Sequence, residues 1–274
     1  PKQSKTKLAK EMGISRQSLY YQPQRPAKDL KLKAEIEKVM SEHKAYGHKR
    51  IALDLKVNKK RILRVMKLFK LKPKRSRKKP DKAKDHGQEA MPIENLLRTY
   101  VVLKPGQVWV ADFTYLPYQG RFVYLATVED IFTRQVIGWA VSVRHNADLV
   151  SQALLDALEK NDRPDIFHSD QGSEYRSEEF LALLKKAGIR PSMSAKGSPW
   201  QNGYKESFYS QFKLELGHPE SYQSLGELVE AIAIQINYYN MRRIHSALKC
   251  PPFVFAQRFQ INQLIQSKPN IQPV

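Results

Sequence analysis

The middle of the chain carries three β-rich runs joined by short turns, "QVWVADFTYLPY", "RFVYLATVED" and "RQVIGWAVSV". Runs spaced this closely predict consecutive antiparallel strands. An amphipathic helix over 147–161 then leads to a short strand over 165–170. Because a strand reached through a helix usually runs parallel to an earlier strand of its sheet, the first and fourth strands can be neighbours. A helix over 177–187, a strand over 189–193, a loop over 194–202 and a further helix complete an α/β layered domain.

Positive charge is concentrated at the front of the chain. Residues 1–90 contain 28 Lys and Arg against 9 Asp and Glu, whereas residues 91–274 contain 19 against 18. This excess indicates a polyanionic partner and favours a nucleic-acid surface over the plain alternative, a solvated helix face. The one cysteine, Cys250, excludes an internal disulfide framework, and no apolar run approaches a membrane span. We therefore expect a cytoplasmic protein that binds nucleic acid and has no membrane partner.

Five segments are expected along the chain. Gly13 as a turn and Ser15 as an N-cap predict a helix-turn-helix in residues 1–22, with an ordinary helical hairpin as the alternative. Asn58 as an N-cap predicts a second one. The other boundaries follow from composition: 28–72 for the second helix-turn-helix region, 73–98 for a basic linker, 99–216 for the α/β core and 217–274 for a C-terminal helical extension.

Three acidic residues stand at positions typical of functional groups. Asp112 lies within an apolar strand, Asp170 ends the fourth strand, and Glu206 begins the helix that follows the loop. Alone, each has a structural explanation: a strand edge, a turn former and a partner of the helix dipole. Together they would repel one another and raise their pKa values, so a cluster of them requires a cation. Oxygen ligands without cysteine select Mg²⁺ or Mn²⁺, and a pair of such ions would activate water at a phosphodiester.

Several motifs around these residues resemble one family. "WVADFTY", "HSDQGSEY" and "SPWQNGYKESFYSQFKLE" resemble the DDE motif of retroviral-integrase-like transposases, and in particular the OrfB part of insertion-sequence transposases of the IS-three group. "YGHKRI" and "VNKKRILRVM" resemble the second helix-turn-helix of that group, and "NYYNMRRIHSAL" resembles its C-terminal signature. The resemblance covers most of the chain.

The resemblance implies an RNase H-like integrase catalytic core behind a basic all-α helix-turn-helix region. It makes Asp112, Asp170 and Glu206 the catalytic, metal-binding triad, with two Mg²⁺ ions for which Mn²⁺ can substitute. The expected reaction is strand cleavage at the element's end, followed by strand transfer by the freed 3′-hydroxyl. The expected partners are double-stranded DNA, as terminal inverted repeats and as target, further copies of the chain, and OrfA as a partner or fusion. No leucine-zipper region like that of OrfA is present, and the start at Pro1 rather than Met agrees with a partial or processed product.

DNA contacts are expected from basic and polar residues spread over five regions. By the resemblance, Lys213 holds a transposon-end phosphate from the helix that carries Glu206. The other candidates are Asn202 and Lys205 near Glu206; Arg242, Arg243 and His245 in the C-terminal signature; Arg16 and Gln17; Lys49, Arg50, Lys59, Lys60, Arg61 and Arg64; and Lys74, Arg75, Arg77, Lys78 and Lys79 in the linker. His168 is better explained as a buried strand histidine than as a metal ligand, and Trp200 serves a base or the core equally well.

Two other functions compete with transposition. A DNA-binding regulator derived from a transposase would use the basic front alone, and a structure-selective RNase H-like nuclease would hydrolyse without joining. The intact acidic triad argues against the regulator. We also hypothesise that the loop of residues 194–202 lets the following helix bring Glu206 into the site only when DNA and metal are bound.

Overall fold

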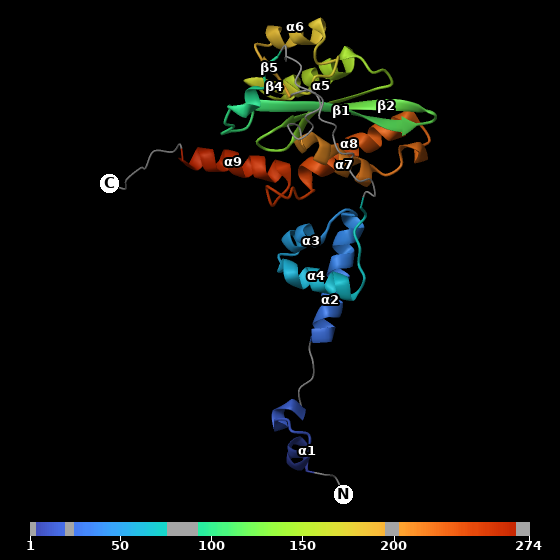
Figure 1. Ribbon diagram of the computed structural model, residues 1–274, viewed down its shortest axis with the longest axis vertical. Coiled ribbons are helices and arrows are strands. Elements are labelled where there is room, and N and C mark those ends of the chain that lie inside the picture. Colours follow the sequence, from blue (N-terminus) through green and yellow to red (C-terminus); the bar gives the residue numbers. More distant parts are fainter. Residues whose placement is uncertain (1–3, 20–24, 76–92, 195–202, 267–274) are drawn as a thin grey trace, which may run out of the picture. The chain divides into compact units, whose positions relative to one another are not determined.

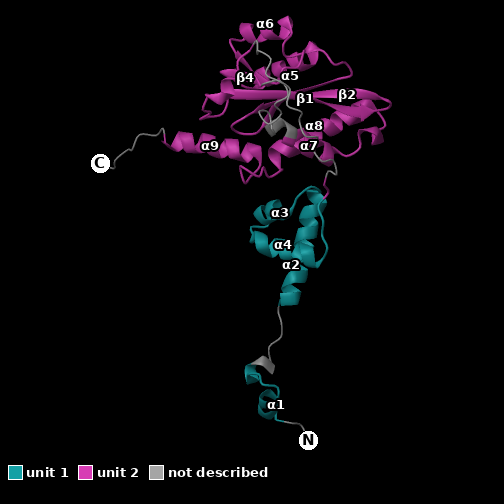
Figure 2. Ribbon diagram, in the orientation of Figure 1, with its two compact units in different colours: residues 1–73 teal, residues 74–274 magenta. Residues whose placement is uncertain are grey.

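The computed structural model describes residues 4–19, 25–75, 93–194 and 203–266. The chain divides into two compact units, Pro1–Pro73 and Lys74–Val274, which Figure 2 shows in different colours. The division falls where the basic linker is expected to begin. No helix among the described residues is long and apolar enough to span a lipid bilayer.

Unit 1 begins with a short helical pair. α1 (Lys5–Glu11) is followed by Gly13, whose φ of +63° lies in the left-handed region that glycine adopts at little cost. The next element is a 3₁₀ helix, η1 (Arg16–Leu19), rather than the α-helix expected after Ser15. The difference has a simple cause, because helical runs this short are commonly closed by i to i+3 hydrogen bonds.

The rest of unit 1 is a three-helix cluster of α2 (Arg25–Glu42), α3 (His48–Asp54) and α4 (Lys59–Leu68). Ile62 and Val65 of α4 are fully buried, as their helical spacing predicts. Asn58 caps α4, since its side-chain oxygen accepts a hydrogen bond from the backbone N–H of Lys60 at 2.8 Å. This cap fixes the residue at which α4 begins. It thereby determines which residues form the solvent-exposed first turn of the helix.

Unit 2 is built on a five-stranded mixed sheet with the order β3-β2-β1-β4-β5. Its strands are β1 (Val108–Tyr118), β2 (Arg121–Asp130), β3 (Val136–Ser142), β4 (Ile166–Ser169) and β5 (Arg190–Met193). β1, β2 and β3 are antiparallel, whereas β4 runs parallel to β1 and β5 runs parallel to β4. The predicted pairing of the first and fourth strands is therefore confirmed. The α/β fold class is confirmed with it.

Helices cover both faces of the sheet. α5 (Ala147–Lys160) and α6 (Glu178–Lys186) pack on one face, and α7 (Gly203–Leu216) and α8 (Leu225–Met241) pack on the other (Figure 1). The remaining elements are η2 (Leu96–Arg98), η4 (Pro219–Ser221) and α9 (Pro252–Gln266). Alternation of side chains along β1 divides its residues between the two cores, with Trp109 toward α5 and Leu116 toward α7.

Gly138 of β3 sets how closely α5 approaches the sheet. A Cβ atom at this position would lie 2.4 Å from the carbonyl oxygen of Ala153 and 2.6 Å from the Cβ of Ala157. We expect Gly138→Ala to destabilise unit 2 by about 1–3 kcal/mol, because the added methyl overpacks the contact between helix and strand. Urea unfolding followed by circular dichroism measures this. Gly226→Ala in α8 is the matched control, since its added Cβ makes only ordinary contact, at 3.7 Å from the Oγ of Ser224, and should raise stability slightly. Equal stabilities for the two variants would contradict this packing.

Candidate active site

The parallel pairing of β1 with β4 places Asp112 and Asp170 at corresponding positions. The register joins Val110 to His168, and the two aspartates each follow two residues later. Val110 and Ile166 pack in the same apolar cluster, and side chains alternate along a strand, so both aspartates belong to the face that carries this cluster. Asp170 stands one residue past the end of β4, at the carboxyl edge where α/β sheets usually carry their functional groups.

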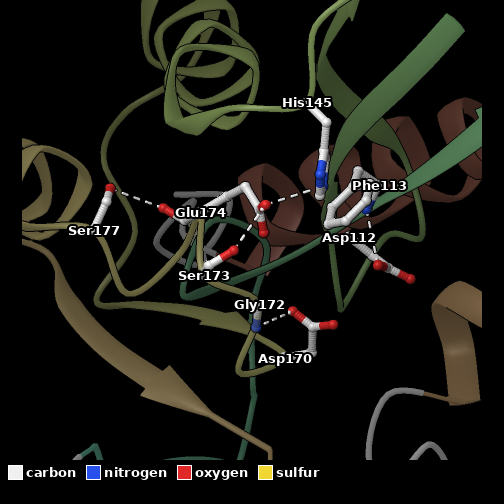
Figure 3. A network of polar contacts seen from close by, with 8 residues as sticks. All are labelled: Asp112, Phe113, His145, Asp170, Gly172, Ser173, Glu174 and Ser177. Carbon is white, nitrogen blue, oxygen red and sulfur yellow. Dashed lines mark hydrogen bonds and ion pairs between the residues drawn. The ribbon is translucent and has the colours of Figure 1, made fainter.

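Asp112 and Asp170 are half-buried, and each is held by a backbone hydrogen bond (Figure 3). The Oδ1 atom of Asp112 accepts from the N–H of Phe113 at 2.8 Å. The Oδ1 atom of Asp170 accepts from the N–H of Gly172 at 3.0 Å. Burial raises the pKa of Asp170, the Gly172 hydrogen bond opposes this rise, and the carboxylate of Glu174 adds to it. The charge on Asp170 is therefore costly unless a cation lies beside it.

Tyr175 is a buried side chain whose pKa is raised by its burial and by the charges of both aspartates. Its ring is fully buried, and its hydroxyl has no hydrogen-bond partner among the described residues. Burial raises the pKa of Tyr175 well above its usual value, and the charges of Asp112 and Asp170 both raise it further. Both aspartates therefore lie within electrostatic reach of one buried hydroxyl that stays protonated.

Glu206 lies in the first turn of α7, and its side chain is outside what the structure describes. The same helix is tied to β1 three residues later, where the hydroxyl of Tyr209 donates to the backbone carbonyl of Asp112 at 2.6 Å. This hydroxyl is also 2.8 Å from the Oγ1 of Thr127 on β2. The beginning of α7 is therefore fixed against the strand that carries Asp112. Among the described side chains no group of three His, Cys, Asp or Glu residues could hold a metal ion.

A further carboxylate beside Asp170, the buried Glu174, was not predicted from the sequence. It is 7% exposed, and its Oε1 atom lies 3.0 Å from the Nε2 of His145 and accepts from Ser173 Oγ at 2.9 Å (Figure 3). A Cβ atom on Gly172 would lie 3.0 Å from the Oε2 of Glu174 and 3.1 Å from the Oδ1 of Asp170. Glycine at this position therefore lets the two carboxylates approach. The only sequence signal was a second acidic residue inside "HSDQGSEY".

His168 is a buried strand histidine, as predicted. Its side chain is fully buried, and its Nδ1 lies 2.9 Å from the Oγ of Ser192 on β5. Burial lowers the pKa of His168 to about 4, so the ring is neutral near pH 7. Cys250 is likewise a small buried residue, at 8% exposed.

Arg243 was predicted to contact DNA, and its position corrects that prediction. Its side chain is 3% exposed, and it forms a buried ion pair with Glu215 of α7 at 2.8 Å and a hydrogen bond with Gln211 at 3.1 Å. Arg243 follows the end of α8, and there two side chains of α7 accept hydrogen bonds from its guanidinium group. Arg64 is also engaged, through two hydrogen bonds to Asp29 at 2.7 and 2.5 Å, although its side chain stays 45% exposed.

Breaking the pair between Arg243 and Glu215 should destabilise unit 2. We expect Arg243→Met to cost about 3–5 kcal/mol, because it leaves the Glu215 carboxylate buried without a partner. The double variant with Glu215→Leu should recover most of the loss, since no uncompensated charge remains. Urea unfolding midpoints of the two variants test this. A single variant as stable as the parent chain would return Arg243 to the DNA-facing candidates.

The other predicted DNA contacts fall into three groups. Exposed or half-buried residues of unit 1 and the linker are Arg16, Gln17, Lys49, Arg50, Lys59, Lys60, Arg61, Lys74 and Arg75. In unit 2 Arg242 is exposed, His245 is half-buried, and the Nζ of Lys213 lies 4.8 Å above the ring of Tyr115. Outside the described residues are Arg77, Lys78, Lys79, Trp200, Asn202, the side chain of Lys205 and most of the loop that was proposed to move Glu206.

Comparison with known proteins places this site in a family. Two models described as "Integrase core domain" match residues 103–199 and 187–252. The transposase of insertion sequence element IS904 from Lactococcus lactis is 34% identical over 226 residues, which are 79% of this chain and 89% of that protein. Transposase InsF of IS3A from Escherichia coli is 37% identical over 215 residues, 73% of each protein.

A solved structure supports the same fold. A chain in the cryo-EM structure of the simian T-cell lymphotropic virus intasome, in complex with PP2A regulatory subunit B56 gamma, matches with a TM-score of 0.51 and 16% identity. The match covers 88% of this chain and 77% of that one.

The mixed sheet with aspartates on adjacent strands is that of an integrase catalytic core, an RNase H-like enzyme fold. The matched relatives narrow the class further. The chain belongs to the insertion-sequence transposases of the DDE type, which are enzymes that act on DNA.

Proposed function

We propose that this transposase cuts a DNA strand at the end of its insertion sequence and joins the freed 3′-hydroxyl to a second phosphodiester. Asp112, Asp170 and Glu206 are proposed as the catalytic residues. The observation that carries the proposal is the bond from Tyr209 to the carbonyl of Asp112, because it holds the helix of Glu206 against the strand of Asp112. The register of β1 and β4 adds Asp170 to the same face.

The donor set fits a hard divalent cation. Asp112 and Asp170 offer carboxylate oxygens, and burial makes the charge of Asp170 costly without a cation. The three carboxylates would hold two Mg²⁺ ions per site, or two Mn²⁺ ions in their place. These ions would act as Lewis acids and stabilise the attacking and leaving oxygens. Tyr209 positions α7 through its hydrogen bond to the carbonyl of Asp112, and the buried Tyr175 hydroxyl lies within electrostatic reach of Asp112 and Asp170.

Unit 1 is proposed to bind the DNA duplex. Lys59, Lys60 and Arg61 form the exposed first turn of α4, the last helix of the second helix-turn-helix region. Exposed cations of this kind neutralise backbone phosphates and displace counterions. Lys213, on the helix of Glu206, is proposed to hold a phosphate near the cut.

Assembly follows from the reaction. An insertion sequence has two ends, so we propose that copies of the chain assemble on terminal inverted repeats and target DNA. An OrfA product is proposed as a partner or fusion, because the chain resembles the OrfB part of insertion-sequence transposases. The solved structure of similar fold described above is that of a viral intasome.

The deciding experiment separates transposase, nuclease and regulator. The chain is incubated with Mg²⁺ and a labelled duplex that carries the terminal inverted repeat flanking its own coding sequence, together with a supercoiled target plasmid. Joined products that disappear in EDTA are expected. Cut but unjoined ends would favour the structure-selective nuclease. Binding without either product would favour the regulator.

A further inference from the structure

Two aromatic side chains stand exposed at the hairpin end of β1 and β2. Tyr115 is 56% exposed and Phe122 is 47% exposed, and their rings contact edge to face with centroids 5.2 Å apart. They lie on paired strands, where Leu116 opposite Val123 sets the register. Large aromatic residues are normally buried to a high degree, so a contacting pair left open to solvent is a candidate binding surface.

A cation joins this pair to the helix of the active site. The Nζ of Lys213 lies 4.8 Å from the centroid of the Tyr115 ring. Lys213 belongs to α7, the helix that also contains Glu206 and that Tyr209 ties to Asp112. Tyr115 follows Asp112 by three residues on β1, a distance of about 10 Å along a strand. Residues three apart on a strand leave it on opposite faces, so it is the contact with Lys213 that links the Tyr115 ring to the helix of Glu206.

We propose that Tyr115 and Phe122 form a stacking platform for an unpaired nucleobase close to the cut phosphodiester. This inference rests on the proposed function, since it assumes that the DNA end lies at Asp112. A separation of about 10 Å equals about three base steps of 3.4 Å, so the platform meets a base within a few nucleotides of the cut. The positive charge of Lys213 favours a nucleic acid over a neutral or basic protein surface, because it can pair with a phosphate adjacent to the stacked base.

The platform predicts a preference for frayed ends that a binding assay can measure. The full chain is titrated, in EDTA, into two labelled duplexes of identical paired sequence, one blunt and one ending in a few unpaired thymines. Fluorescence anisotropy gives both affinities. Tyr115→Ala and Phe122→Ala should each weaken binding to the overhang duplex by about 5- to 150-fold and leave the blunt duplex unchanged. Tyr115→Phe should retain the preference, because it keeps the ring.

Controls separate stacking from other effects. Leu103→Ala removes another exposed apolar side chain, 70% exposed and located before β1 begins, and should change neither affinity. Replacing the unpaired thymines with abasic sites should abolish the preference in the parent chain. If Tyr115→Ala binds the overhang duplex as tightly as the parent chain does, the platform is refuted. If Tyr115→Ala instead has a lower molar mass in solution than the parent chain, measured by light scattering, and binds the overhang duplex with unchanged affinity, the surface belongs to a contact with a second copy of the chain.

The platform and the proposed function fail separately. The binding assay contains no Mg²⁺ and requires no cleavage. If Tyr115→Ala loses the preference for the overhang duplex but the parent chain never cuts DNA, the proposed function alone is refuted. A chain that cuts and joins while Tyr115→Ala binds normally would refute the platform alone.

Discussion

We expect strand cleavage to slow by about 10³-fold or more in each of three variants, Asp112→Asn, Asp170→Asn and Glu206→Gln. When residues act as one catalytic unit, removing any one of them abolishes nearly all of the rate enhancement of the unit. Each amide keeps the size and polarity of its carboxyl group but removes the negative charge that a divalent cation requires. Affinity for the duplex should stay within about two-fold, because phosphate contacts from Lys and Arg set it. Single-turnover cleavage of a labelled terminal-repeat duplex and anisotropy measure the two quantities.

A matched control separates this loss from a general charge effect. Asp162→Asn removes an exposed carboxylate that follows α5, and it should cleave at the rate of the parent chain. Cleavage at the parental rate by Asp112→Asn or Glu206→Gln would sink the assignment of the catalytic residues.

Tyr209→Phe should reduce the cleavage rate by about 10- to 100-fold, the range typical of partners that orient metal-binding groups. The substitution removes one oxygen atom, and with it the hydrogen bonds from α7 to the carbonyl of Asp112 and to Thr127. The aromatic ring still fills its place beside Phe208. Because the first turn of α7 loses its anchor, the Mg²⁺ concentration for half-maximal rate should rise, an effect that a purely structural tyrosine would not have. Titration of Mg²⁺ in the cleavage assay measures it.

Tyr222→Phe is the control for this experiment. Its hydroxyl also donates to a backbone carbonyl, that of Leu216 at 3.2 Å, but at the far end of α7 from Glu206. It should cleave normally with an unchanged Mg²⁺ requirement. If Tyr209→Phe behaves in the same way, the bond to Asp112 does not position the site.

The sheet could be predicted from the sequence because its signals are local. The run "RFVYLATVED" matches β2 from Arg121 to Asp130, and the helix after the third run explains the parallel pairing of β4. That pairing, in turn, brings Asp112 and Asp170 into register. A few consecutive residues are enough to show the apolar spacing of an amphipathic helix or the alternation of apolar and polar side chains along a strand.

The side chains that complete the site could not be predicted, since their roles depend on contacts between distant elements. Tyr209 reads as an ordinary core aromatic until α7 is placed against β1. Arg243 and its neighbour Arg242 look equivalent in "NYYNMRRIHSAL", and only the end of α8 decides that Arg243 points to Glu215. The role of Glu174 could not be predicted for the same reason. Its position beside Asp170 depends on the close approach that glycine at position 172 allows.

The most direct test of the central claim is whether Glu206 shares one metal site with Asp112 and Asp170. Ferrous ion bound in place of Mg²⁺ generates hydroxyl radicals with ascorbate and peroxide, and these cut the backbone close to the ion. Mass spectrometry of the fragments should show cuts near residues 112, 170 and 206 together, all of them lost in Asp112→Asn. Cuts near 112 and 170 with none at the beginning of α7 would contradict a site formed by all three carboxylates.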